Sequence, residues 1–176
     1  MSSGLPGFRG FDHIGITVPN LGEAIAFFCD VIGCELIYRA GAFGDDEGTF
    51  MRDQLNVHRR ARIRGVAFLR CWNNSNLELF EYDSPDQKNV APKNSDIGGH
   101  HIAFYVEDIE RAVEHLRHHN IRILGNPVVE PGGPDHGVTW LYFLAPWGLQ
   151  LELITYPTGK DYEAETQARL WDPRLT

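Results

Sequence analysis

The chain contains two copies of one sequence pattern, and this duplication limits what it can fold into. A histidine begins an apparent strand in the segment Asp12–Val18, and another does so in the segment His100–Val106. A glutamate flanked by leucines follows later in each copy, within Asn76–Tyr82 and within Gln150–Tyr156. One unit of roughly 70 residues cannot cover its own sheet, so we expect the two copies to pair around a shared concave face.

Aligning the copies requires two different offsets. His13 and His101 are 88 residues apart (101 − 13), whereas Glu78 and Glu152 are 74 apart (152 − 78). The first copy is therefore 14 residues longer (88 − 74), and the extra length falls most naturally within residues 40–64. Long excursions inside compact domains are usually functional or disordered, and we expect a short ordered element over the mouth of the site.

The order of the predicted elements indicates the fold class. Each copy reads as a strand, a helix and three further strands, with the helices expected over Leu21–Val31 and Ile109–His119. This order predicts an α+β fold of two paired βαβββ modules, in which a cup-like mixed sheet has its helices outside. The predicted divisions are an N-terminal arm (1–10), a first module (11–82), a linker (83–99), a second module (100–156) and a C-terminal tail (157–176).

Composition excludes several classes of partner. A formal charge of −8 argues against binding to nucleic acid, whose phosphates require a basic surface. No apolar run reaches the roughly 18 residues of a membrane span, and no leader pattern precedes the first strand. Cys29, Cys34 and Cys71 match no metal or redox spacing, so we expect ordinary thiols in a cytoplasmic protein.

The matched histidines and glutamates are the candidate site. Alternate residues of a strand face one side, so Glu78 and Glu152 face opposite to their flanking leucines and are expected to line the concave surface. A charged side chain is costly there unless it is paired or bound to a metal. A single strand histidine is usually a surface or hydrogen-bonded residue, but four candidates at duplicated positions favour one divalent metal, namely Zn, Ni, Mn, Fe or Co, held by His13, Glu78, His101 and Glu152.

These segments resemble the vicinal-oxygen-chelate superfamily, which includes glyoxalase I, bleomycin resistance proteins and extradiol dioxygenases. The resemblance spans about residues 10–156 and implies that the four residues at these positions are the metal ligands. It also implies weaker candidates for substrate binding: His136, in a Gly- and Pro-rich loop, and Tyr142. One departure is Ala145–Gly148, where the family more often has Asp-Pro-x-Gly, and it affects a turn rather than the metal ligands.

The resemblance and the ligand set together favour a metal-dependent lyase or isomerase of the glyoxalase type. A small oxygen-chelating substrate would bind the metal, and Glu78 or Glu152 would transfer a proton through an enediolate. The alternatives are a ring-cleaving extradiol-type dioxygenase and a non-catalytic protein that binds a small molecule such as an antibiotic. A homodimer is expected, and the residues do not distinguish a site within one chain from a site across two.

Overall fold

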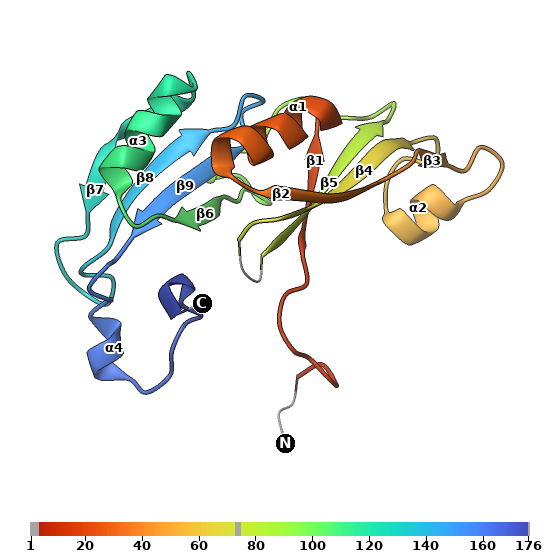
Figure 1. Ribbon diagram of the computed structural model, residues 1–176. Helices are drawn as coiled ribbons and strands as arrows, with labels where there is room; N and C mark the ends of the chain where they lie inside the picture. Colours follow the sequence, from red (N-terminus) through yellow and green to blue (C-terminus); the bar gives the residue numbers. More distant parts are fainter. Residues whose placement is uncertain (1–3, 73–74, 176) are drawn as a thin grey trace. The chain divides into compact units, whose positions relative to one another are not determined.

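The computed structural model describes residues 4–72 and 75–175 (Figure 1). The chain divides into two compact units, Met1–Gln87 (unit 1) and Lys88–Thr176 (unit 2). Residues 1–3 of the predicted arm and residue 176 of the predicted tail lie outside the described part, and residues 4–13 contain no helix or strand. Each unit is an α+β arrangement, which confirms the predicted fold class.

Unit 1 contains a mixed sheet in the order β1-β5-β4-β2, with the short β3 paired to β4. Strand β1 runs parallel to β5, and the other pairs are antiparallel. The elements of this unit are β1 (Ile14–Val18), α1 (Leu21–Ala26), the π-helical segment η1 (Phe27–Ile32), β2 (Glu35–Ala40), β3 (Phe43–Gly44), α2 (Phe50–Leu55), β4 (Arg62–Arg70) and β5 (Asn76–Asp83).

Unit 2 repeats this sheet in the order β6-β9-β8-β7, again with its first and last strands parallel. The C-terminal tail adds two short helices after the sheet. The elements of this unit are β6 (Ile102–Tyr105), α3 (Ile109–His118), β7 (Arg122–Val129), β8 (Thr139–Leu144), β9 (Gln150–Thr155), α4 (Tyr162–Glu165) and the 3₁₀ turn η2 (Pro173–Leu175).

Both units form their helices and cores for the same reasons. The side chains of Asn20 and Asp108 accept hydrogen bonds from backbone N–H groups in the first turns of α1 and α3, as expected of N-caps. The leucines that flank each glutamate are buried: Leu79 and Leu151 are 0% exposed. Helix α1 contacts β4 and β5, and α3 contacts β7 and β9. The sheet face opposite the leucines is therefore left for the glutamates.

Two sequence predictions need correction. The expected helix Leu21–Val31 divides into α1 and η1, and consecutive residues Phe27 and Phe28 are both buried, at 4% and 0% exposure. The wider π turn brings the directions of neighbouring side chains closer together, so both rings pack inward. Gly33 ends the segment with a left-handed φ of 92°, which glycine adopts without strain.

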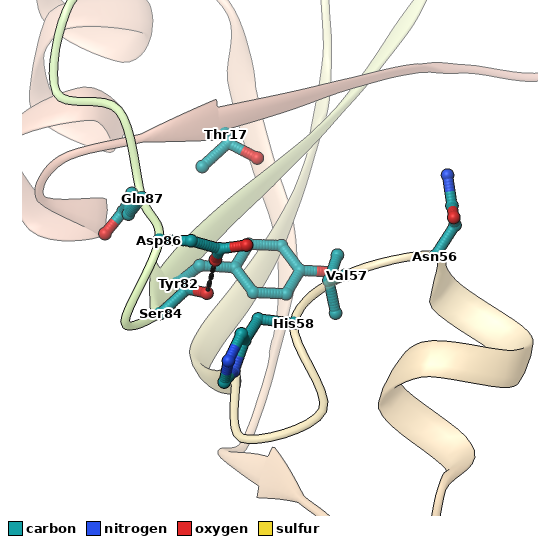
Figure 2. Close-up of a pocket in the computed structure, with 8 residues that line it drawn as sticks. All are labelled: Thr17, Asn56, Val57, His58, Tyr82, Ser84, Asp86 and Gln87. Carbon is teal, nitrogen blue, oxygen red and sulfur yellow. Dashed lines mark hydrogen bonds between the residues drawn. The ribbon is translucent and has the colours of Figure 1, made fainter.

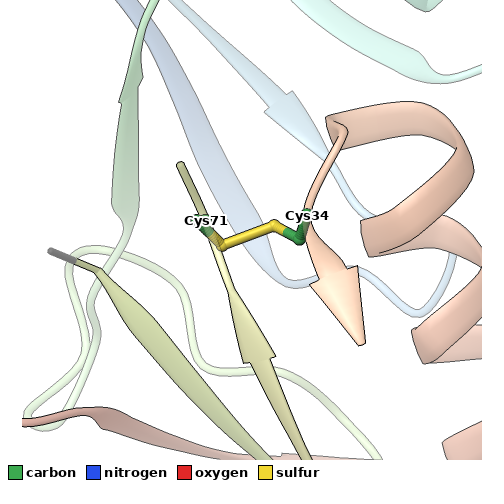
Figure 3. Close-up of a disulfide and its surroundings, with 2 residues drawn as sticks. All are labelled: Cys34 and Cys71. Carbon is green, nitrogen blue, oxygen red and sulfur yellow. A yellow bond between two sulfur atoms is a disulfide. The ribbon is translucent and has the colours of Figure 1, made fainter. Parts of the chain in front are cut away.

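The second correction concerns the cysteines, because Cys34 and Cys71 form a disulfide (Figure 3). Glu35, the first residue of β2, pairs with Arg70, the last residue of β4. Cys34, just before β2, and Cys71, just after β4, therefore lie opposite each other, with Cα atoms 4.4 Å apart. The prediction of free thiols is wrong for these two and holds for Cys29. Among the described residues, no helix is long and apolar enough to cross a bilayer.

Candidate active site

In unit 1 the structure brings His13 and Glu78 together. The Nε2 atom of His13 lies 3.0 Å from Oε2 of Glu78, and its Nδ1 atom lies 2.7 Å from Oδ2 of Asp12. Parallel pairing places Gly15 of β1 beside Glu78 of β5, so the histidine just before β1 reaches the carboxylate. The hydrogen bond to Asp12 is the main cause of a raised His13 pKa.

In unit 2 the same arrangement joins His101 and Glu152. Nε2 of His101 lies 2.9 Å from Oε2 of Glu152, and Nδ1 lies 3.3 Å from the side-chain amide of Asn94. Glu152 is only 7% exposed. Burial raises the pKa of its carboxyl, while His101 and Lys160 act in the opposite direction.

An aromatic ring lies beside each pair, and the two rings differ by one hydroxyl. Phe68 is cross-strand to Glu78 and packs edge-on to His13, with ring centroids 5.5 Å apart. Tyr142 is cross-strand to Glu152 and packs edge-on to His101 at 5.1 Å. Unit 2 therefore has a tyrosine hydroxyl at the cross-strand position where unit 1 has a phenylalanine. The pKa of Tyr142 is raised by burial and by the nearby Glu152.

The other weak candidate, His136, lies against the C-terminal tail. Its Nδ1 atom is 3.0 Å from Oδ2 of Asp161, and the neighbouring Asp135 lies 3.4 Å from Lys160. These contacts connect the loop before β8 to the tail, so His136 has a structural contact of its own. A role for it in substrate binding stays a prediction.

The donor atoms of each pair suit a first-row divalent metal. Imidazole nitrogen and carboxylate oxygen are ligands that Zn, Mn, Fe, Co and Ni accept, and the second ring nitrogen of each histidine has a neighbour that can orient the ring. In the part of the chain that is described, no group of three or more His, Cys, Asp or Glu side chains is arranged to hold an ion. Each unit by itself thus brings together one histidine and one glutamate.

A pocket of about 400 Å³ in unit 1 was not predicted (Figure 2). It is lined by Thr17 of β1, by residues 56–58 after α2, and by Tyr82 together with the turn after β5, from Ser84 to Gln87. The sequence feature that could have indicated this pocket is the extra length of the first copy, 14 residues, because it supplies α2 and the segment that follows it. This extra length did not indicate which side chains would face the pocket.

Comparison with known proteins identifies the family. The model of the Glyoxalase/Bleomycin resistance protein/Dioxygenase superfamily matches residues 12–140, which is more than half of the chain. The chain belongs to this superfamily, and the resemblance seen in the sequence is confirmed.

Individual relatives differ in their named activities. A 2-epi-5-epi-valiolone epimerase from Actinomyces sp is 45% identical over 171 residues, covering 97% of this chain and 92% of the relative. A protein named as a probable lactoylglutathione lyase from Synechocystis sp. is 27% identical and covers 85% of this chain and 97% of its own length. The epimerase relative supports an isomerase-type enzyme.

Solved structures show the same fold. A glyoxalase family protein from Bacillus cereus has a TM-score of 0.67 at 22% identity, covering 88% of this chain and 97% of the other. A fosfomycin resistance protein from Listeria monocytogenes has a TM-score of 0.55 at 15% identity, covering 84% of this chain and 93% of the other. At these identities the likeness concerns the fold alone.

Proposed function

We propose that this protein is a divalent-metal-dependent epimerase that inverts a hydroxyl-bearing carbon next to a ketone. The observation that carries the proposal is the duplicated pair, His13 with Glu78 and His101 with Glu152, at 3.0 and 2.9 Å. The epimerase relative supports the reaction type, because its name denotes a change at one stereocentre of a ketone.

We assign the two pairs to a single metal ion, with two ligands from each unit. The units would come from one chain or from two chains of a homodimer. When bound, a divalent metal polarises a carbonyl and stabilises the negative charge that develops on its oxygen. The donor set fits this role because Glu152 is almost fully buried beside an imidazole, and a buried carboxylate needs a cationic partner.

The residues of the chain supply the proton transfers. Inversion at carbon requires that a proton leave one face and that a proton arrive on the opposite face. Glu78 and Glu152 are the two carboxylates at duplicated positions, so one accepts the proton from carbon and the other, once protonated, returns one. Tyr142 packs against His101, and in this proposal its hydroxyl donates a hydrogen bond to a substrate oxygen.

Metal content and proton exchange test the proposal together. Elemental analysis of the purified protein should find about one transition metal per chain, and His101→Ala should lose it. His136→Ala is the matched control, since that histidine contacts the tail instead of a glutamate. In deuterated water that contains the metal-loaded protein, an α-hydroxyketone should exchange its α-proton for deuterium. A chelator should stop this exchange.

Other outcomes would favour the alternatives. Loss of a hemithioacetal substrate with formation of a thioester would indicate a lyase, as in the name of the Synechocystis relative. Oxygen consumption with a catechol and ferrous iron would indicate a dioxygenase. Metal binding without proton exchange on any α-hydroxyketone would contradict the epimerase proposal.

A further inference from the structure

The two units differ at one equivalent place, which is filled in unit 2. There the ring of Tyr156 lies beneath two cations of the tail: Lys160 Nζ is 4.8 Å and Arg174 Cζ 5.0 Å from its centroid. Tyr105 packs edge-on to the same ring at 4.9 Å. Tyr156 is consequently only 8% exposed. The protein's own C-terminal segment occupies this place in unit 2.

In unit 1 the same place is open. The offset of 74 residues makes Tyr82 the counterpart of Tyr156, and the offset of 88 makes Thr17 the counterpart of Tyr105. A threonine stands where the second copy has a bulky tyrosine, and both Tyr82 and Thr17 line the pocket of about 400 Å³. Ligand pockets are commonly of this size. The unfilled copy is therefore a candidate binding pocket.

The lining favours an uncharged ligand that is rich in hydroxyl groups. Seven of the eight lining residues carry hydroxyl, amide, imidazole or carboxylate groups, and none of the eight is a lysine or an arginine. The hydroxyl of Ser84 donates to Oδ1 of Asp86 at 2.6 Å, which fixes the carboxylate while its other lone pairs remain able to accept. A phosphate or carboxylate ligand would meet the Asp86 carboxylate with no lysine or arginine in the lining to offset the repulsion, whereas a ligand hydroxyl would donate to it.

The pocket is on the same sheet face as His13 and Glu78. Glu78, Phe80 and Tyr82 alternate along β5 and share a face, and Thr17 of β1 is cross-strand to Phe80. Two residues along a strand span about 7 Å, so Thr17 lies roughly that far beyond the level of Glu78. Glu78 also contributes to the raised pKa of Tyr82, which places the two in electrostatic reach. One small molecule could extend from the carboxylate into the pocket.

We propose that this pocket is the specificity subsite that binds the hydroxyl groups of a polyhydroxylated ketone remote from the carbon that is inverted. The inference rests on the proposed epimerase function and adds the substrate class to it. Tyr82 and Asp86 are the lining groups chosen to test it, because each brings a polar group to the pocket. Figure 2 shows the Tyr82 side chain extending from β5 toward Val57, with Asp86 and Ser84 on the turn that follows.

The test compares two ketones on the metal-loaded protein. One is 2-epi-5-epi-valiolone, and the other is 2-hydroxycyclohexanone, which has an α-hydroxyketone but no remote hydroxyl groups. The measured quantity is kcat/KM for 2-epi-5-epi-valiolone divided by kcat/KM for 2-hydroxycyclohexanone. Tyr82→Phe and Asp86→Asn should each reduce this ratio by about tenfold, mainly by raising KM for 2-epi-5-epi-valiolone. Tyr156→Phe removes the same atom at the filled place in unit 2 and should leave the ratio unchanged.

The outcomes separate this inference from the proposed function. Equal loss of kcat/KM for both ketones, or an effect of Tyr156→Phe as large as that of Tyr82→Phe, would overturn the subsite while leaving the epimerase standing. Should neither ketone react, calorimetry decides: 2-epi-5-epi-valiolone that binds wild-type protein about tenfold more tightly than Asp86→Asn supports the pocket without the reaction. Equal affinities, or no binding, would overturn it.

Discussion

At the scale of single residues, the two histidines occupy duplicated positions but differ in the partner of their second ring nitrogen. His13 has the Asp12 carboxylate at 2.7 Å, whereas His101 has the Asn94 amide at 3.3 Å. A carboxylate on the second nitrogen orients an imidazole and increases its basicity as a ligand. The two halves of the proposed metal site are thus expected to bind with unequal strength.

Exchanging these partners tests that expectation. Asp12→Asn gives His13 the kind of partner that His101 has, and metal affinity should fall by about tenfold because a neutral amide leaves the imidazole a less basic ligand than a carboxylate does. Asn94→Asp is the reciprocal variant and should tighten binding. Competition against a chromophoric chelator at pH 8 measures both constants. If both variants bind like wild type, the second partners do not contribute.

The candidate site was predictable from the sequence as far as its duplication extends. His13, Glu78, His101 and Glu152 could be chosen because each repeats a motif at an equivalent position, and the structure forms a His–Glu contact within each unit. The pocket beside Tyr82 could not be predicted in the same way. Thr17 and Tyr82 lie in repeated strands, but residues 56–58 come from the extra length of the first copy and Ser84, Asp86 and Gln87 from the predicted linker, so the repeat does not bring these lining residues together.

At the scale of elements, the disulfide between Cys34 and Cys71 fastens the start of β2 to the end of β4. Its residues are 37 positions apart, so closing this loop in the unfolded chain removes conformational entropy worth about 4 kcal/mol. Such bonds are more typical of oxidising compartments than of the cytoplasm, and a cytoplasmic location stays a prediction.

Cys34→Ser should lower the free energy of unfolding by about 2–4 kcal/mol in the absence of reductant. Urea denaturation measures the loss, and dithiothreitol should reduce wild-type stability to that of the variant. Cys29→Ser is the control, because Cys29 is a free thiol and its substitution removes no disulfide. Burial raises the pKa of the Cys29 thiol, which keeps it in the less reactive protonated form. A Cys34→Ser variant insensitive to reductant but equal in stability to oxidised wild type would refute a stabilising bond.

Hydrogen bonds from Arg174 hold the C-terminal tail against the rest of unit 2. The Arg174 guanidinium donates to the Tyr156 carbonyl at 2.9 Å and to the Asp172 carboxylate at 2.6 Å. The hydrogen bond from Arg174 is the main cause of the lowered Asp172 pKa. The pKa of Asp172 is lower in the folded state than in the unfolded state. The ion pair with Arg174 therefore contributes to stability above the ordinary aspartate pKa of about 3.9, and this contribution is lost as pH falls through the folded-state pKa.

Hydrogen exchange should therefore show the tail losing protection in acid before β9 does. Arg174→Ala should remove the protection of residues 166–175 even at pH 7. Arg169→Ala is the matched control, because the partners of Arg169 among the described residues are backbone carbonyls within the tail. Equal protection factors in Arg174→Ala and wild type, after correction for intrinsic rates, would contradict the anchoring role.

Helix faces and strand alternation follow local patterns, and these were predictable. The buried residues of α3 are Ile109, Val113 and Leu116, which are the three residues of its apolar face. The disulfide and the anchoring of Arg174 depend on strand register and on contacts between distant segments, which local periodicity does not encode. The widening of α1 into η1 depends on tertiary packing of Phe27 and Phe28, for the same reason.

At the scale of the whole molecule, a metal shared by both units would link their stabilities. A ligand that binds only the folded state adds about 2.7 kcal/mol when its free concentration is 100 times Kd. Calorimetry should show an increased melting temperature on addition of the metal, and Glu78→Gln and Glu152→Gln should each abolish the increase. Loss of the increase in only one of these variants would place the metal within a single unit.

The order of strands has a consequence for synthesis of the chain on the ribosome. In each sheet the first strand pairs with the last, so β1 waits for β5 and β6 waits for β9. Neither sheet can close until its final strand has been translated, which makes each unit a slow, non-local folding problem. Unit 1, however, contains all of its own strands before residue 88. Its strands can pair, and Cys34 can meet Cys71, while the second half is still being made.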